Sequence, residues 1–207
     1  MSTDTEEEIL RAATAVLERG GVQALTTRAV CEAAGVKSPT LYHYFGGKDG
    51  LAATLVRRGM VQFMAKKRAI QRSDDPMQQL RDGWNVAVDF ALANPALHAL
   101  YTEQLRTQPG LADEAYAAMR SHVQRLVDRG VFQLGVDEAA RAVWAASSGV
   151  LALVSAGRSR REVEATSRTL FDAVVTQLSA PGLADPGRLA SPAKRGLRAP
   201  PAARAVP

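Results

Sequence analysis

The residues with the clearest chemical potential lie in the segment 38–43. Ser38, Pro39 and Thr40 open it, and Tyr42 and His43 follow. Short hydroxyls, a threonine methyl group and two hydrogen-bonding rings suit the base edges and phosphates of a DNA major groove, which admits a helix. We therefore predict that these side chains lie on the exposed face of a DNA-contacting helix. Packing against the core beneath is the alternative for the two rings.

Two basic residues flank this segment. Arg28 precedes it, and Lys48 follows directly after Gly46-Gly47. An arginine can reach a guanine edge or a phosphate, and a lysine at a helix N-terminus adds its charge to free N–H groups that favour an anion. We predict that both contact DNA, with ordinary solvated charges as the alternative. Because the net charge of this region is small, one copy alone should bind weakly.

Two short helices must position these side chains. Thr26 can cap a helix over 27–34, Gly35 can end it with a positive φ, and Ser38-Pro39 can start a second helix that runs to about Tyr44. Helices this short are unstable alone, so they must pack on each other. The pattern predicts a helix-turn-helix whose two helices meet at Val30, Ala34, Val36, Leu41 and Tyr44.

Helical periodicity continues through most of the chain. Thr5 to Glu8 has the spacing of a capping box, and Gly20-Gly21 is expected to end the first helix. No segment alternates with the period of a strand, so the fold class is all-α. Further helices are expected at 48–72, 76–93, 95–107, 110–129, 137–156 and 160–179.

Composition excludes several classes of protein. No apolar run approaches the ~18 to 20 residues of a membrane span, and the acidic N-terminus is unlike a signal peptide, which predicts a cytoplasmic protein. Cys31 is the single cysteine, so we expect a small packed side chain there, no disulfide and no structural zinc site. Catalytic motifs and an acid/base constellation are missing, so neither an enzyme nor a cofactor is expected.

The net charge of +5 is concentrated in two places. The segment 51–73 holds six basic and no acidic residues, and the tail 181–207 holds five basic residues and one acidic residue. The basic residues of 51–73 are predicted to form the solvent-exposed face of a connecting helix. A module that binds a membrane surface is a weaker alternative, because Phe63 is the only aromatic residue that could anchor this helix. The proline-rich tail should be disordered. It is either an extension without a role or a basic segment that weakly attracts a polyanionic partner.

Four motifs occur in a specific order in the N-terminal region, and together they resemble the DNA-binding head of the TetR family of bacterial transcriptional regulators. The resemblance runs from about Glu8 to Leu55 and implies that Thr27 also contacts DNA. The motifs are Leu25-Thr26-Thr27-Arg28, Glu32-Ala33-Ala34-Gly35-Val36, Thr40-Leu41-Tyr42-His43-Tyr44-Phe45 and Lys48-Asp49-Gly50-Leu51.

The resemblance implies an N-terminal three-helix head at 1–55 and a C-terminal helical ligand-binding and dimerisation domain at 56–180. It further implies a homodimer that binds a near-palindromic double-stranded DNA operator. Such a protein usually represses transcription and is released by a small-molecule effector, here expected to be largely apolar. Activation of transcription is the alternative within the family.

The expected C-terminal domain resembles one ligand-domain subgroup less specifically, through the segments 90–97 and 144–149. Ser148 stands where that subgroup has a histidine. The apolar faces of the helices at 137–156 and 160–179 suit a four-helix dimer interface. Side chains that could line an effector pocket, or belong to a solid core instead, are Phe63, Trp84, Asn85, Phe90, His98, Tyr101, Gln104, Met119, Trp144 and Ser148.

Overall fold

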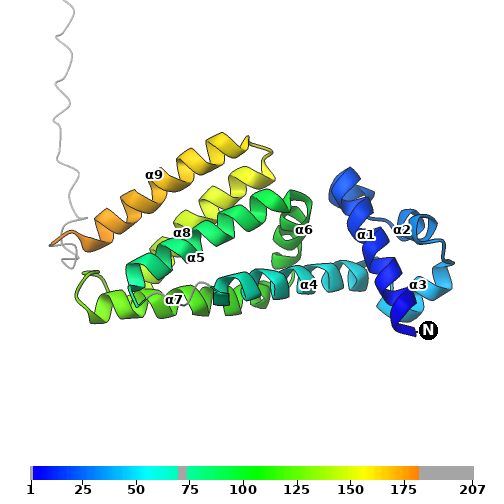
Figure 1. Ribbon diagram of the computed structural model, residues 1–207, viewed down its shortest axis with the longest axis horizontal. Helices are drawn as coiled ribbons and strands as arrows, with labels where there is room; N and C mark the ends of the chain where they lie inside the picture. Colours follow the sequence, from blue (N-terminus) through cyan, green and yellow to red (C-terminus); the bar gives the residue numbers. More distant parts are fainter. Residues whose placement is uncertain (1, 70–73, 182–207) are drawn as a thin grey trace, which may run out of the picture.

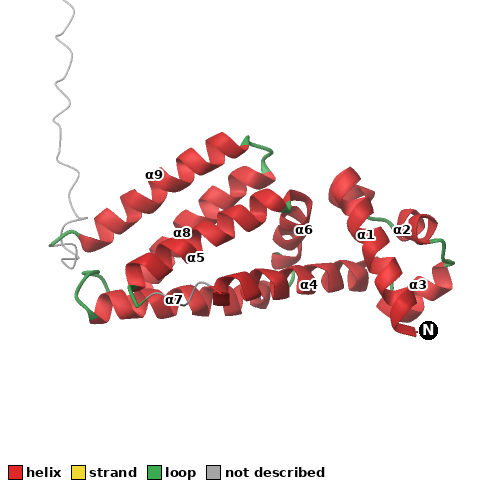
Figure 2. Ribbon diagram, viewed as in Figure 1, coloured by secondary structure: helices red, strands yellow, loops and turns green. Residues whose placement is uncertain are grey.

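The structure is a computed structural model that describes residues 2–69 and 74–181. Within these ranges the chain is helical and contains no strand, which confirms the predicted fold class (Figure 1; Figure 2). Across the same ranges, no helix has the length and apolar character needed to cross a membrane. The elements are α1 (Ser2–Ala24), α2 (Thr27–Ala34), α3 (Ser38–Phe45), α4 (Lys48–Ala69), α5 (Pro76–Ala93), α6 (Pro95–Leu105), the 3-10 helix η1 (Pro109–Ala112), α7 (Asp113–Asp128), α8 (Val136–Ser155) and α9 (Arg160–Ser179).

An N-terminal head forms one end of the molecule (Figure 1). It comprises α1, α2, α3 and the first half of α4, and both ends of α2 follow from the expected capping residues. The Thr26 hydroxyl accepts a hydrogen bond from the Ala29 N–H at 3.1 Å, and Gly35 ends α2 with a φ of 66°. The head closes around buried side chains that include Ile9, Leu17, Leu25, Val30, Cys31, Leu41, Phe45 and Leu51.

The predicted starts of three helices, α1, α3 and α7, differ from those in the structure. Helix α1 begins at Ser2, so Thr5 lies inside it, while Gly21 breaks it with a φ of 67°. The N-cap of α3 is Lys37 and not Ser38, because the Thr40 N–H already donates to the Lys37 carbonyl at 3.0 Å. Helix α7 begins at Asp113 and not at residue 110, because Pro109–Ala112 form the separate 3-10 helix η1.

Helix α4 joins the head to the body. Leu51 and Leu55 are buried in the head core, whereas Phe63 and Met64 are buried in a cluster of the body. The predicted boundary between residues 55 and 56 therefore falls inside a continuous helix. The predicted end of this helix at 72 and the tail beyond Pro181 lie outside the described residues.

The body is a bundle in which α8 and α9 lie side by side next to α5 and α7 (Figure 1). Several residues that were predicted to form a dimer interface belong to the core of this bundle and are buried within the single chain. These residues are Ala139, Val143, Val150, Val154, Val163, Phe171 and Leu178. The apolar faces of α8 and α9 were assigned to a partner because the sequence does not reveal that α5 and α7 already cover them.

One hydrogen bond crosses the body core. The Trp84 indole N–H donates to the Ser167 hydroxyl at 2.8 Å, and both residues are buried. We expect Ser167→Ala to lower the free energy of unfolding by about 1 to 3 kcal/mol, because the indole N–H would lose its partner in a buried site. Denaturant unfolding measures this change. The control is Thr169→Ala, whose exposed hydroxyl bonds to a carbonyl of its own helix, and equal effects of both variants would contradict the assignment.

Candidate nucleic-acid interface and internal cavity

The outer face of α3 carries the side chains that were predicted to contact DNA. Ser38, Pro39 and His43 are exposed, Thr40 is half-buried, and Tyr42 has 55% of its surface accessible. Leu41 and Phe45 on the opposite face are buried in the head core and fix the orientation of the helix. The helical period thus separates anchoring residues from residues that are free to bind.

A tight turn joins α3 to α4 and sets the position of Tyr42. Gly46 and Gly47 both have positive φ values, 69° and 123°, and the Gly46 N–H donates to the Tyr42 carbonyl at 2.9 Å. The Tyr42 ring packs against the turn at Gly47, where an added Cβ would lie only 3.2 Å from Cε1 of the ring. The other side of the ring is exposed to solvent. This contact holds the ring in place without burying it.

The other predicted DNA contacts also lie at the surface of the head. Arg28 is exposed on α2, Thr27 is half-buried beside it, and Lys48 is exposed at the first residue of α4. The His43 ring stands edge-on to the Tyr44 ring, with centroids 5.1 Å apart. Lys37, which the sequence interpretation did not select, is exposed at the start of α3 and adds a further cation to this surface.

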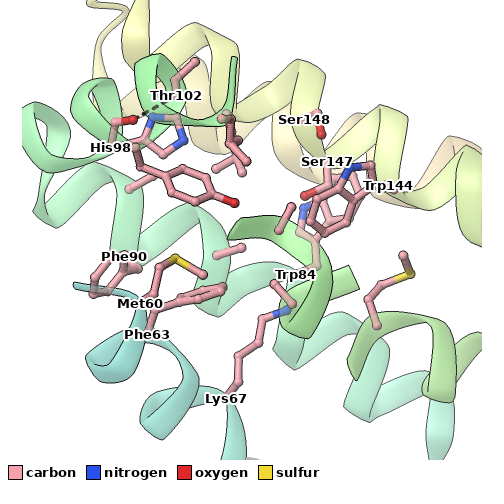
Figure 3. A pocket seen from close by; sticks show the side chains of 18 of the residues that line it. Met60, Phe63, Lys67, Trp84, Phe90, His98, Thr102, Trp144, Ser147 and Ser148 are labelled. Carbon is pink, nitrogen blue, oxygen red and sulfur yellow. Dashed lines mark hydrogen bonds between the residues drawn. The ribbon is translucent and has the colours of Figure 1, made fainter. Parts of the chain in front are cut away.

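A cavity of about 430 Å³ lies in the body, between α4, α5, α6, α7 and α8 (Figure 3). Its volume falls in the range of small-molecule sites. Most of its wall is apolar or aromatic. Of the side chains predicted to line a pocket, the cavity brings together Phe63, Trp84, Phe90, His98, Tyr101, Met119, Trp144 and Ser148.

Two predicted pocket residues do not line this cavity. Gln104 is not among the residues that line it, and its side-chain oxygen accepts a hydrogen bond from the Gln108 amide at 3.1 Å. The α6 residues that line the cavity are Leu97, His98, Tyr101, Thr102 and Leu105. Helical spacing alone does not exclude position 104, which follows Tyr101 by three residues and Leu97 by seven. Asn85 is exposed on α5.

The polar groups of the cavity lie in different parts of its wall. His98 Nδ1 and the Ser155 hydroxyl are 3.1 Å apart, with Thr102 nearby, whereas Lys67 enters from α4 on the opposite side in Figure 3. Burial lowers the pKa of His98 and raises that of Tyr101. Burial also lowers the pKa of Lys67 to about 8.

The prediction that the basic residues of 51–73 all lie on a solvent-exposed helix face is wrong for Lys67. Its side chain is only partly exposed and lines the cavity, unlike those of Lys66 and Arg68, which are exposed. The spacing held a signal that was missed: Lys67 follows Phe63 by four residues and Met60 by seven, so all three share one helix face. Ser147 and Ser155 are further polar lining residues that sequence reasoning did not place in a pocket, and His122, an alternative candidate beside His98, also lines the cavity.

The sequence of the head matches a known protein family. Residues 9–55 match the family described as "Bacterial regulatory proteins, tetR family". The N-terminal head of the chain is therefore similar to this family of regulators. This is a family of regulators and not of enzymes, and its match covers the helix-turn-helix and the start of α4.

Curated relatives of the chain include two mycobacterial repressors. KstR2 of Mycobacterium tuberculosis, an HTH-type transcriptional repressor, is 25% identical over 132 residues, which are 63% of this chain and 66% of the relative. KstR of Mycolicibacterium smegmatis, also an HTH-type transcriptional repressor, is 32% identical over 126 residues, 60% of each protein. The alignments thus span less than two thirds of each relative's length.

Solved structures of bacterial transcriptional regulators share the fold of both the head and the body, over about 83% of the chain. FadR of Bacillus subtilis, solved in complex with stearoyl-CoA, superposes with a TM-score of 0.68 at 15% identity, covering 83% of this chain and 98% of that one. The TetR-family regulator PfmR of Thermus thermophilus superposes with a TM-score of 0.67 at 21% identity, covering 83% and 99%. At this identity the likeness concerns the fold alone.

Proposed function

We propose that this protein is a transcriptional repressor that binds a near-palindromic operator as a homodimer and releases it when a small, largely apolar molecule occupies the body cavity. The observation that carries the proposal is that one chain combines an exposed recognition face on α3 with an apolar cavity, joined by α4 and α6. DNA contact is assigned to Thr27, Arg28, Ser38, Pro39, Thr40, Tyr42, His43 and Lys48.

Helix α6 connects the cavity to the head. Leu100 is 2% exposed and belongs to the head core cluster, while His98, Tyr101 and Thr102 on the same helix line the cavity. A molecule in the cavity therefore touches an element that also packs against α1. A small shift of α6 would displace the head helices that pack against it, because close-packed interiors transmit displacements to neighbouring elements.

Helix α4 crosses α6 closely at Gly59. A Cβ at this buried position would lie only 2.6 Å from Cδ2 of Leu97, a residue that lines the cavity and also packs on the head core. The missing side chain lets the two helices approach each other. Movement of α6 is thereby coupled to α4, whose N-terminus carries Lys48.

The names of the relatives support repression and an apolar effector. KstR2 and KstR are described as repressors, and the structure of FadR contains stearoyl-CoA, a molecule with a long hydrocarbon chain. The apolar wall of the cavity in this chain suits a hydrocarbon body. In a strain that lacks the protein, a repressed promoter would rise in activity, whereas loss of activity would favour the activator alternative.

A homodimer through α8 and α9 is part of this proposal. The core takes many of their apolar side chains, but partly exposed apolar residues remain for a partner. These are Leu153, Leu170, Val174 and Val175, next to the exposed small residues Ala145 and Gly149. Two copies would also double the cationic surface, which a head with few charges needs for useful affinity.

Selection of bound fragments from genomic DNA tests the proposed function. The full chain is expected to enrich fragments that share a near-palindromic sequence. Recovery of fragments with no common sequence, by a protein that retains its helical content, would contradict sequence-specific binding.

Lys48→Ala is expected to weaken binding to all DNA sequences about equally and to reduce the salt slope by about 1 per subunit, as for the loss of one phosphate contact. Affinities measured over a series of salt concentrations give the slope. Lys66→Ala removes the same charge from an exposed position of the same helix, far from its N-terminus, and should leave the slope unchanged. An effect of Lys48→Ala confined to one base position would contradict a phosphate contact.

A further inference from the structure

Among the described residues, the cavity wall contains one lysine, no arginine and no carboxylate. Lys67 supplies the basic group, and the other titratable lining groups are His98, Tyr101 and His122. Burial, followed by the charges of Arg125 and Lys67, lowers the pKa of His122 to about 4. The pKa of His98 is also lowered by burial, so both imidazoles are neutral at pH 7. The Lys67 ammonium, with a pKa of about 8, stays largely protonated there.

Lys67 forms no ion pair within the described part of the chain. Its neighbour Arg68 takes the nearby carboxylate of Glu114 at 2.7 Å on the outer surface. The Lys67 Nζ atom lies 5.1 Å from the centroid of the Phe63 ring, an interaction that replaces only part of the lost hydration. A partly buried ammonium without a counter-ion is unusual, because buried charges are normally paired.

A second basic group reinforces the potential at this end of the cavity. Arg125 on α7 bonds to both Gln79 and His122, and His122 lines the cavity beside Lys67. A small recess next to the cavity is lined by Lys67, Arg68, Gln79 and His122. The end of the cavity between α4, α5 and α7 therefore attracts an anion, whereas the end at His98 and Ser155 presents neutral hydrogen-bonding groups.

We propose that the effector is a hydrocarbon with one carboxylate, whose anionic head pairs with Lys67 and whose apolar body extends between Trp144 and Tyr101. This inference rests on the proposed function, since it names the chemical class of the molecule that occupies the proposed effector cavity. A 150 Å³ cavity holds one benzene molecule, so by proportion a cavity of about 430 Å³ accommodates roughly 15 to 20 non-hydrogen atoms. A medium-length fatty acid or a compact polycyclic acid has this size.

Binding to the cavity can be followed by intrinsic fluorescence. Trp84 and Trp144 are the only two tryptophans of the chain, and both line the cavity. The full-length protein is titrated with dodecanoate and with dodecanamide, which have the same number of non-hydrogen atoms but differ in charge. Dodecanoate is expected to bind roughly 10- to 100-fold more tightly, the range for a hydrogen bond to a charged group.

Two matched variants assign this preference to Lys67. Lys67→Met keeps an unbranched side chain that is one atom shorter and removes the charge, so dodecanoate and dodecanamide should bind with affinities within a few-fold of each other. Lys66→Met removes a charge from the adjacent exposed position and should retain the full preference. The unfolding temperature of Lys67→Met should be equal to or above that of the wild type, because the lost ammonium has no partner ion.

Dodecanoyl-CoA distinguishes a carboxylate from the phosphates of a thioester. Its carbonyl is uncharged, so it is expected to bind more weakly than dodecanoate. If dodecanoyl-CoA instead binds more tightly than dodecanoate, and Lys67→Met removes this advantage, then Lys67 pairs with a phosphate of the thioester. That result would overturn the proposal.

Equal affinity of the wild type for dodecanoate and dodecanamide, or a preference that survives in Lys67→Met, would also overturn the proposal. These outcomes leave the proposed regulator intact, because binding to selected DNA is measured separately on the same preparation. Absence of any fluorescence change with all three probes would overturn the proposal together with the effector role of the cavity. Failure to bind DNA would contradict the proposed function alone.

Discussion

Tyr42→Ala should weaken specific operator binding by roughly 1 to 3 kcal/mol, which is the range for a side chain that reads a base edge. The reason is the position of Tyr42: its ring is 55% exposed on the recognition face and is held there by contact with the Gly47 turn. Fluorescence anisotropy with a labelled operator measures the loss, and non-specific DNA should be affected much less.

Val61→Ala is the control for this variant. Val61 is 65% exposed on α4 and lies outside the recognition face, so its truncation should leave operator affinity unchanged. Both variants should unfold at nearly the temperature of the wild type. Unchanged operator affinity of Tyr42→Ala, at unchanged thermal stability, would remove Tyr42 from the recognition surface. Tyr42→Phe separates the contribution of the hydroxyl from that of the ring.

Occupation of the cavity should weaken operator binding by about 5- to 150-fold, which corresponds to a coupling free energy of 1 to 3 kcal/mol. Two recognition helices fit successive major grooves only if their centres are about 34 to 36 Å apart, or a whole-turn multiple of that, so small displacements of the heads spoil the fit. The shared packing of α6 with the cavity and with the head core provides the connection.

Thermodynamic linkage makes this prediction testable in both directions. Operator DNA must weaken binding of the ligand by the same factor by which the ligand weakens binding of the operator. Dodecanoate is the first ligand to test, with tryptophan fluorescence for its binding and anisotropy for that of the operator. A ligand that saturates the cavity and leaves operator affinity unchanged would refute release by this route, although DNA binding itself would stand.

The helix-turn-helix could be predicted in detail because its signals are local. Thr26 caps α2, Gly35 ends it in the left-handed region, and the proline at position 39 lies in the first turn of α3. Each signal acts within a few residues of its own position. The misplaced N-cap of α3 is an error of one residue, since Lys37 rather than Ser38 holds the extended backbone before the helix.

The cavity could be predicted only in part because it depends on how distant helices pack. Lys67 lies in a run of basic residues, and its spacing places it on the helix face of Met60 and Phe63. The sequence does not show that this face lines a cavity, because that depends on the helices packed beside α4. Gln104 is polar and lies on the same helix as other lining residues, α6, but its side chain bonds to Gln108 and does not line the cavity. The buried faces of α8 and α9 were likewise assigned to a partner, because a sequence does not distinguish a core within one chain from an interface between two.

A footprint of the full chain on a fragment recovered by genomic selection tests the central claim most directly. Two protected regions on one side of the DNA are expected, with centres about 10 to 10.5 base pairs or a whole-turn multiple apart, as for two recognition helices in successive major grooves. They should disappear together when Tyr42 is replaced by alanine at a concentration near the dissociation constant. A single protected region, or protection without sequence preference, would contradict a dimer that reads its operator through α3.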